Sequence, residues 1–196
     1  MNTFVWYSPL TDAHIASIVP RLAEWGFDAV EFPLETPGDW DSGHARELLQ
    51  RYGLRSVVGA VFGPERQLTA ATENVIADTS QYVKHCVDVA AAQGAKAVIG
   101  PMYTAVGRTW RMDEHERRLS VRRLRESLRP LADYAAHRNV QLGLEPLNRY
   151  ETSLINTVEQ ALEVIDGIAP EVLGLNLDTY HQNIEEKSIP NAVRAA

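Results

Sequence analysis

The sequence has 196 residues but only one cysteine, Cys86, and no apolar run near the ~18 residues that a membrane-spanning helix needs. A single cysteine excludes an internal disulfide and is typical of a protein in a reducing compartment. The first residues also lack the basic stretch followed by an apolar stretch that marks a secretory signal. These scarcities predict a cytoplasmic protein that does not cross a membrane.

Positive charge is scarce as well. Lys and Arg together number 19 and Asp and Glu number 26, which gives a formal net charge of −7. Nucleic-acid binders need a basic surface, so this balance argues against a nucleic-acid partner. Hydrophobic types make up 45% of the chain, which is enough to bury a core, and we find no linker. The sequence predicts one domain that spans residues 1–196.

Short apolar segments alternate with longer segments of helical periodicity. A glycine separates helix from strand at three of the joints, Gly26, Gly53 and Gly94. The pattern predicts strands over residues 4–7, 29–32, 55–62, 96–100, 140–145 and 172–178. It predicts helices over residues 12–25, 41–52, 75–93, 113–137 and 157–168, and the start of a sixth from residue 184.

About six strand–helix units of this length predict a parallel sheet with right-handed crossovers. Two α/β architectures fit. One is an open, doubly wound sheet, whose dinucleotide-binding form has a glycine-rich phosphate loop after the first strand. The segment Ser8-Pro9-Leu10-Thr11 is not such a loop. The other is a (β/α)₈ TIM barrel that is incomplete at its C-terminal end, since a complete barrel takes ~250 residues.

Two carboxylates directly follow apolar strands, Glu145 after the fifth and Asp178 after the sixth. Parallel α/β folds place their sites at these strand ends. Burying a carboxylate is costly unless something positive meets it. One interpretation is an ion pair with Arg149 or hydrogen bonds from backbone N–H groups. The other is that both carboxylates bind one divalent cation, with His181 close by.

Two longer motifs contain these residues. The first is EPLNRYE over residues 145–151, followed by LINT over residues 154–157, and the second is LDTYHQNIEE over residues 177–186. Both resemble the ketose 3-epimerase family (D-tagatose and D-allulose 3-epimerases) within the xylose isomerase-like TIM barrels. The family has Met where this chain has Gln182. Windows of this length are far more specific than a three-residue motif.

The resemblance implies a role for each site residue. Glu145 would be a metal ligand and a catalytic carboxylate, and Asp178 a second metal ligand. His181 and Glu151 would hydrogen-bond substrate hydroxyls, and Trp6 would form an aromatic wall. The small-molecule partner would be a ketose, and the cofactor a divalent ion: Mn²⁺, Mg²⁺ or Co²⁺. The reaction would invert C3 through an enediolate, with one carboxylate removing the proton and another returning it on the opposite face.

The family's remaining metal ligands are a His on a seventh strand and a Glu on an eighth, both beyond residue 196, and that Glu is also the second catalytic base. The resemblance therefore implies that this chain alone turns over little or no ketose, and its open sheet edges favour a homo-oligomer. Alternatives are an aldose–ketose isomerase, an inosose dehydratase and an inactive truncated barrel. An apurinic-site DNA endonuclease is disfavoured, because it needs many strand-end histidines and only His181 qualifies.

Overall fold

The computed structural model describes all 196 residues as five strands and eight helical segments. The strands are β1 (Ala29–Leu34), β2 (Arg55–Ala60), β3 (Ala97–Gly100), β4 (Gln141–Leu144) and β5 (Leu173–Leu175). The helices are a 3₁₀ turn (Thr3–Val5), α1 (Asp12–Glu24), α2 (Ser42–Tyr52), α3 (Glu73–Gln93), α4 (Glu114–Ala136), α5 (Val158–Ile165), α6 (Thr179–Glu185) and α7 (Ile189–Ala195). None of these helices combines the length and the apolar content needed to span a lipid bilayer.

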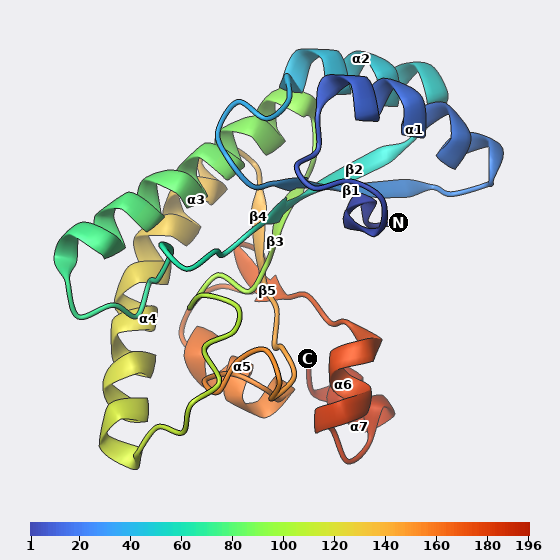
Figure 1. Cartoon of the computed structure of the whole chain (residues 1–196). Helices are drawn as coiled ribbons and strands as arrows, with labels where there is room; N and C mark the ends of the chain where they lie inside the picture. The colour runs from blue at the N-terminus through green and yellow to red at the C-terminus, as the bar shows by residue number, and fades with distance from the viewer.

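The five strands are all parallel and lie in the order β1-β2-β3-β4-β5. A doubly wound sheet reverses its strand order at a switch point, whereas a barrel wall does not. Each helix from α1 to α5 packs on the next one, so α1 and α2 cover one end of the sheet and α5 the other (Figure 1). The order confirms the barrel architecture and excludes the open doubly wound sheet.

The predicted strand over residues 4–7 is wrong. The Asn2 side chain accepts a hydrogen bond of 2.8 Å from the Phe4 N–H and caps a 3₁₀ turn. Only a single bridge, between Asn2 and Glu31, remains at the outer edge of β1. Four apolar residues suit a strand or a buried turn equally well, and here the local cap decides.

The predicted single helix from residue 184 is also wrong, because this region holds two short helices. The Asp178 side chain caps the start of α6, which ends before an extended Glu186. Pro190 then lies in the first turn of α7, where its missing N–H leaves no hydrogen bond unmade. The predicted strand over residues 172–178 is correspondingly shortened to β5, since its last residues form the approach to α6.

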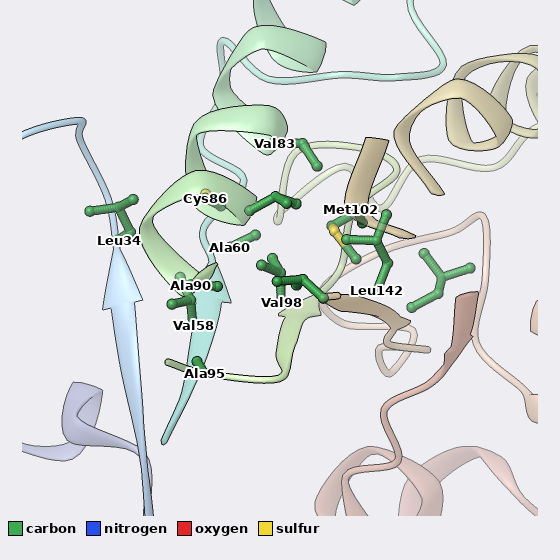
Figure 2. Close-up of a cluster of buried hydrophobic side chains, with 14 of the residues drawn as sticks. Leu34, Val58, Ala60, Val83, Cys86, Ala90, Ala95, Val98, Met102 and Leu142 are labelled. Atoms are coloured by element: carbon green, nitrogen blue, oxygen red, sulfur yellow. The ribbon is translucent and has the colours of Figure 1, made fainter. Parts of the chain in front are cut away.

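One face of the sheet carries the hydrophobic core. A row of fully buried residues in register runs across all five strands. It consists of Phe32, Val58, Val98, Leu142 and Leu173. Figure 2 shows Val58 and Val98 of this row beside Val83, Cys86 and Ala90 of α3. The outer face of the sheet is thus sealed by helices, as in a barrel.

The opposite face carries small residues. The next row along the strands consists of Pro33, Gly59, Ile99, Gly143 and Gly174. Because successive residues of a strand point to opposite sides, this row faces the barrel interior. Its three glycines leave space for longer polar side chains that reach in from neighbouring positions.

Candidate functional site

Glu145 and Asp178 lie where their strands end. The Glu145 N–H donates to the Gly100 carbonyl at 3.1 Å, which extends the β3–β4 ladder by one residue and fixes the backbone. Asp178 is the N-cap of α6, and its Oδ1 accepts a hydrogen bond of 2.7 Å from the Tyr180 N–H. Its second oxygen remains free to face the barrel interior. The hydrogen bond of Glu145 to β3 and the cap formed by Asp178 therefore bring both carboxylates to the C-terminal ends of the parallel strands.

Three of the predicted site residues converge there. One potential ligand atom from each of Glu145, Asp178 and His181 lies within 4.8 Å of the others. The Asp178 side chain is 43% exposed and that of His181 is 10% exposed, so the cluster opens to solvent on one side. Two carboxylates and an imidazole are ligands that suit Mn²⁺, Mg²⁺ or Co²⁺, and the group contains no thiolate of the kind found in many zinc sites.

The hydrogen bonds of His181 define its tautomer. Its Nδ1 lies 3.2 Å from the backbone N–H of Asn148, a group that only donates, so this nitrogen accepts. In the neutral ring the proton therefore resides on Nε2, which lies 3.9 Å from Asp178 Oδ2. This tautomer presents a donor to the opening. It suits a hydrogen bond to a substrate oxygen, whereas ligation of a metal through Nε2 would require loss of that proton.

Glu151 reaches the same opening from the loop after β4. Its Oε1 accepts a hydrogen bond of 2.8 Å from Asn148 Nδ2 and lies 3.8 Å from His181 Nδ1. Asn156 braces this loop by donating to the carbonyls of Leu147 at 2.7 Å and Thr152 at 3.0 Å. The EPLNRYE and LINT motifs therefore form one hydrogen-bonded unit that positions Glu151 beside His181.

The competing interpretation is correct in part, because Asp178 accepts a hydrogen bond from the backbone N–H of Tyr180, but no ion pair forms between Glu145 and Arg149. Arg149 instead makes a two-pronged pair with Glu185, at 2.8 and 2.9 Å, and its backbone N–H donates to the same carboxylate at 2.7 Å. These contacts hold the pKa of Glu185 below its usual value. Glu145 forms no salt bridge in the structure, so its side chain remains available to a ligand.

Glu31 is a further member of the cluster and was not among the residues that the sequence predicts for the site. It projects from β1 and lines the same cavity as Glu145 and Asp178. Burial is the largest cause that raises the pKa of Glu31 to about 7. The positive charge of the N-terminus opposes this rise, and the negative charge of Asp178 adds to it. A carboxylate in the middle of the apolar segment AVEFPL was the available signal.

The pKa of Glu145 is raised in the same way, to about 7. Burial is the largest cause and the charge of Glu31 the next, while a hydrogen bond from Asn176 opposes them. Buried carboxylates whose pKa is raised by burial and by neighbouring negative charge are typical of functional sites. Glu31 and Glu145 are therefore the two carboxyl groups of the cluster whose pKa lies near neutral pH.

Gly59 makes room for Glu31. A Cβ atom at position 59 would lie 2.7 Å from Glu31 Oε1, which is shorter than any normal contact. The glycine row of the inner face thus lets the Glu31 side chain lie across the sheet toward Glu145.

The cavity over the cluster has a volume of about 220 Å³ and is lined by Glu31, Glu145, Glu151, Asp178 and His181 together with apolar side chains. An adjoining hollow of about 330 Å³ shares Glu31, Glu145 and Asp178. Phe4 supplies an aromatic wall of the smaller cavity. Trp6 lies outside it and instead packs on Trp25, with ring centroids 6.0 Å apart. The structure thus brings four of the five predicted site residues together, and Phe4 stands where Trp6 was expected.

Comparison with known proteins gives a consistent result. The chain matches the family described as xylose isomerase-like TIM barrel over residues 19–195. It is 30% identical to an L-ribulose 3-epimerase of Methylomonas sp. (strain DH-1), over 100% of this chain and 67% of that protein. It is also 30% identical to a ketose 3-epimerase of Arthrobacter globiformis, over 94% of this chain and 63% of that protein.

Solved structures agree. A crystal structure of a D-allulose 3-epimerase from Methylomonas sp. in complex with D-allulose superimposes with a TM-score of 0.87 at 30% identity, covering 100% of this chain and 67% of that one. A structure of an L-ribulose 3-epimerase gives a TM-score of 0.88 at 25% identity and covers 65% of that chain. The chain spans about two thirds of the length of these relatives.

Proposed function

Because the chain belongs to the xylose isomerase-like TIM barrel family, we propose that it takes part in the metal-dependent epimerisation of a ketose at C3. The observation that carries the proposal is Glu145, a strand-end carboxylate with a raised pKa and no cation partner, which has Asp178 as a potential co-ligand and His181 as a potential substrate donor within 4.8 Å. The relatives named ketose 3-epimerase and L-ribulose 3-epimerase support the substrate class.

Each residue has a role in this proposal. Glu145 and Asp178 would hold the divalent ion, and Glu145 would also remove the C3 proton. When bound, the ion supplies Lewis-acid stabilisation of the negative charge that develops on the substrate's carbonyl oxygen. A base with a pKa near neutrality is well matched to taking and returning a proton at physiological pH.

His181 and Glu151 would orient the sugar. The Nε2–H of His181 donates to a substrate oxygen, while the Glu151 carboxylate accepts from a hydroxyl. Because Asn148 contacts both side chains, at 2.8 Å in each case, their spacing is fixed before substrate arrives. Fixed spacing lowers the entropic cost of reaching a reactive geometry.

The experiment follows the C3 hydrogen of D-fructose, D-tagatose or L-ribulose in D₂O with Mn²⁺, by proton NMR. Exchange of this hydrogen with solvent needs one base only, so it reports on Glu145 independently of the base that completes the inversion. We expect Glu145→Gln to reduce exchange by a factor on the order of 10²–10⁴. Glu126→Gln, on the outer face of α4, is the matched control and should leave the rate unchanged.

Binding of Mn²⁺ gives a second readout that does not depend on turnover. Glu145→Gln and Asp178→Asn should each weaken Mn²⁺ binding measured by electron paramagnetic resonance, whereas Glu151→Gln should not. Exchange that persists in Glu145→Gln at the wild-type rate would remove this residue from the mechanism. Equal Mn²⁺ affinity in all three variants would place the ion elsewhere.

We also propose that copies of the chain associate through the exposed edges of the sheet. The outer edge of β5 has no strand neighbour, and unpaired edges pair readily with other chains. Sedimentation of the purified protein tests this, and a clean monomer would contradict it.

The single thiol, Cys86, is buried in the core, which fits our placement of the protein in the cytoplasm.

A further inference from the structure

A second hollow lies at the opposite end of the sheet from the carboxylate cluster. It has a volume of about 480 Å³ and is lined by the first residues of β1 and β2, by α2, and by the end of α3. In a parallel sheet all strands begin at one end of the sheet and finish at the opposite end. This hollow lies at the N-terminal ends of the strands and is therefore separate from the proposed catalytic site at their C-terminal ends. None of the residues assigned a role in the proposed function lines it.

The lining of this hollow is basic. Arg46, Arg55 and Lys96 belong to it, and no carboxylate does. None of the three takes part in a salt bridge, whereas Arg51, the other arginine of α2, stacks over the Tyr52 ring. Cations also favour the negative ends of helices, and α2 and α3 both end here. That preference explains basic residues on the surface but leaves the buried floor of the hollow unexplained.

The floor contains a buried amide that lacks a partner. Gln93, in the last turn of α3, is only 4% exposed and lines the hollow. Its Nε2 donates to Ser56 Oγ at 3.1 Å, while its Oε1 has no hydrogen-bond partner. Buried polar atoms in native proteins are nearly always paired, so an unpaired one in a residue that lines a hollow indicates a missing partner.

We propose that this hollow binds a small phosphate monoester. The three cations would hold the phosphate, which carries close to two negative charges at neutral pH, and arginine matches phosphate oxygens with paired N–H donors. The Gln93 amide and the Ser56 hydroxyl would hydrogen-bond a hydroxyl group on the body of the ligand. Leu49, Leu54 and Val57 supply an apolar wall, and the volume falls in the range of small-molecule sites.

Isothermal titration calorimetry of the purified protein tests the proposal with three probes: fructose 6-phosphate, inorganic phosphate and fructose. We expect fructose 6-phosphate to bind most tightly, inorganic phosphate more weakly, and fructose not to bind at this end of the barrel. EDTA and the Glu145→Gln background remove any contribution from the carboxylate cluster, so failure here is distinct from failure of the proposed function.

Variants divide the site into its two parts. Arg55→Gln and Lys96→Gln should each weaken fructose 6-phosphate by about tenfold, the loss of one charge-assisted hydrogen bond. Arg51→Gln is the matched control, because Arg51 lies on α2 outside the hollow, and it should change the affinity less than about twofold. Gln93→Leu should weaken fructose 6-phosphate but leave inorganic phosphate unchanged.

Several results would overturn the proposal. An absence of heat with fructose 6-phosphate at millimolar concentration would do so, as would equal binding of fructose and fructose 6-phosphate. Equal losses in Arg51→Gln and Arg55→Gln would show only diffuse attraction to surface charge. Thermal melts verify that Gln93→Leu folds, and Ser56→Ala serves in its place if it does not, with the same selective loss expected.

Discussion

The two faces of the sheet are built from the same five strands, but they differ in almost every physical property. The outer face presents Phe32, Val58, Val98, Leu142 and Leu173 in one buried row beneath the helices. The inner face presents glycines, with Glu31 and Glu145 at its ends. The outer row has many packed neighbours and no charge, whereas the inner one has charge and open space. Stability and chemistry thus occupy alternate residues of the same strands.

The largest expected effect is on the outer face. Leu142→Ala removes a fully buried side chain from the centre of the core row and should lower the free energy of unfolding by about 2–5 kcal/mol. Its matched partner is Ile99→Ala, on the half-buried inner face, for which we expect a loss of about 1 kcal/mol. Urea denaturation followed by circular dichroism measures both. Equal losses would mean that the inner face is packed as tightly as the outer one.

A smaller effect is expected where the inner face is crowded by one carboxylate. Gly59→Ala places a methyl group 2.7 Å from Glu31 Oε1, so the glutamate must move. We expect a loss of stability of about 1–3 kcal/mol, the usual range for overpacking. The double variant Gly59→Ala/Glu31→Ala removes the clash and should be more stable than the sum of the single losses predicts. Additive losses would show that the backbone, and not Glu31, resists the methyl group.

The charge of Glu31 itself should destabilise the fold at high pH. Its pKa rises from about 4.5 in the unfolded chain to about 7 in the fold, so the folded state binds more protons between these values. The extra proton binding by folded Glu31 therefore adds to the free energy of unfolding at low pH, and this contribution is lost as the pH rises through about 7. Glu31→Gln mimics the protonated form and should gain about 1–2 kcal/mol over the wild type at about pH 8, allowing for partial exposure.

Melting curves in EDTA at about pH 4.5 and about pH 8 measure this difference. The gain from Glu31→Gln should shrink markedly at the lower pH, where the folded wild type is already protonated at this position. Glu126→Gln, on the solvent side of α4, supplies the control and should show no such dependence. A gain that is equal at both pH values would mean that the ionised Glu31 carries no penalty.

The sequence predicts local features of this molecule better than it predicts meetings between distant ones. The ends of α2, α3 and α4 were readable because Asp41, Gly53, Gly94 and Asp113 cap them through their own neighbours. Glu145 and Asp178 were readable as candidates because each directly follows an apolar strand. In both cases the physical cause lies within a few residues of its effect.

The meeting of Glu31 with Glu145 and the place of Phe4 at the cavity could not be predicted in this way, although Glu31 is conspicuous within the apolar segment AVEFPL. The approach of Glu31 to Glu145 depends on the curvature of the sheet and on the space at Gly59, neither of which leaves a local pattern. The replacement of Trp6 by Phe4 at the cavity follows from a 3₁₀ turn where a strand was expected, which shifts the direction of each side chain. The motif resemblance located the loop residues, but not the residues that face them across the barrel.

The smallest expected effect is at charges that neither face uses. The arginines of α4 look like a basic patch in the sequence, yet Arg118 simply pairs with Glu114 at 2.9 Å, one turn away, with both side chains more than 60% exposed. Exposed pairs of this spacing contribute about 0.3–0.5 kcal/mol, so Glu114→Gln should change stability by no more than that, and less in high salt. Urea denaturation at two salt concentrations measures it. Ionised Glu114 and ionised Glu31 carry the same charge and differ in their burial. A larger change in the free energy of unfolding for Glu114→Gln than for Glu31→Gln would show that burial does not determine the cost of the charge.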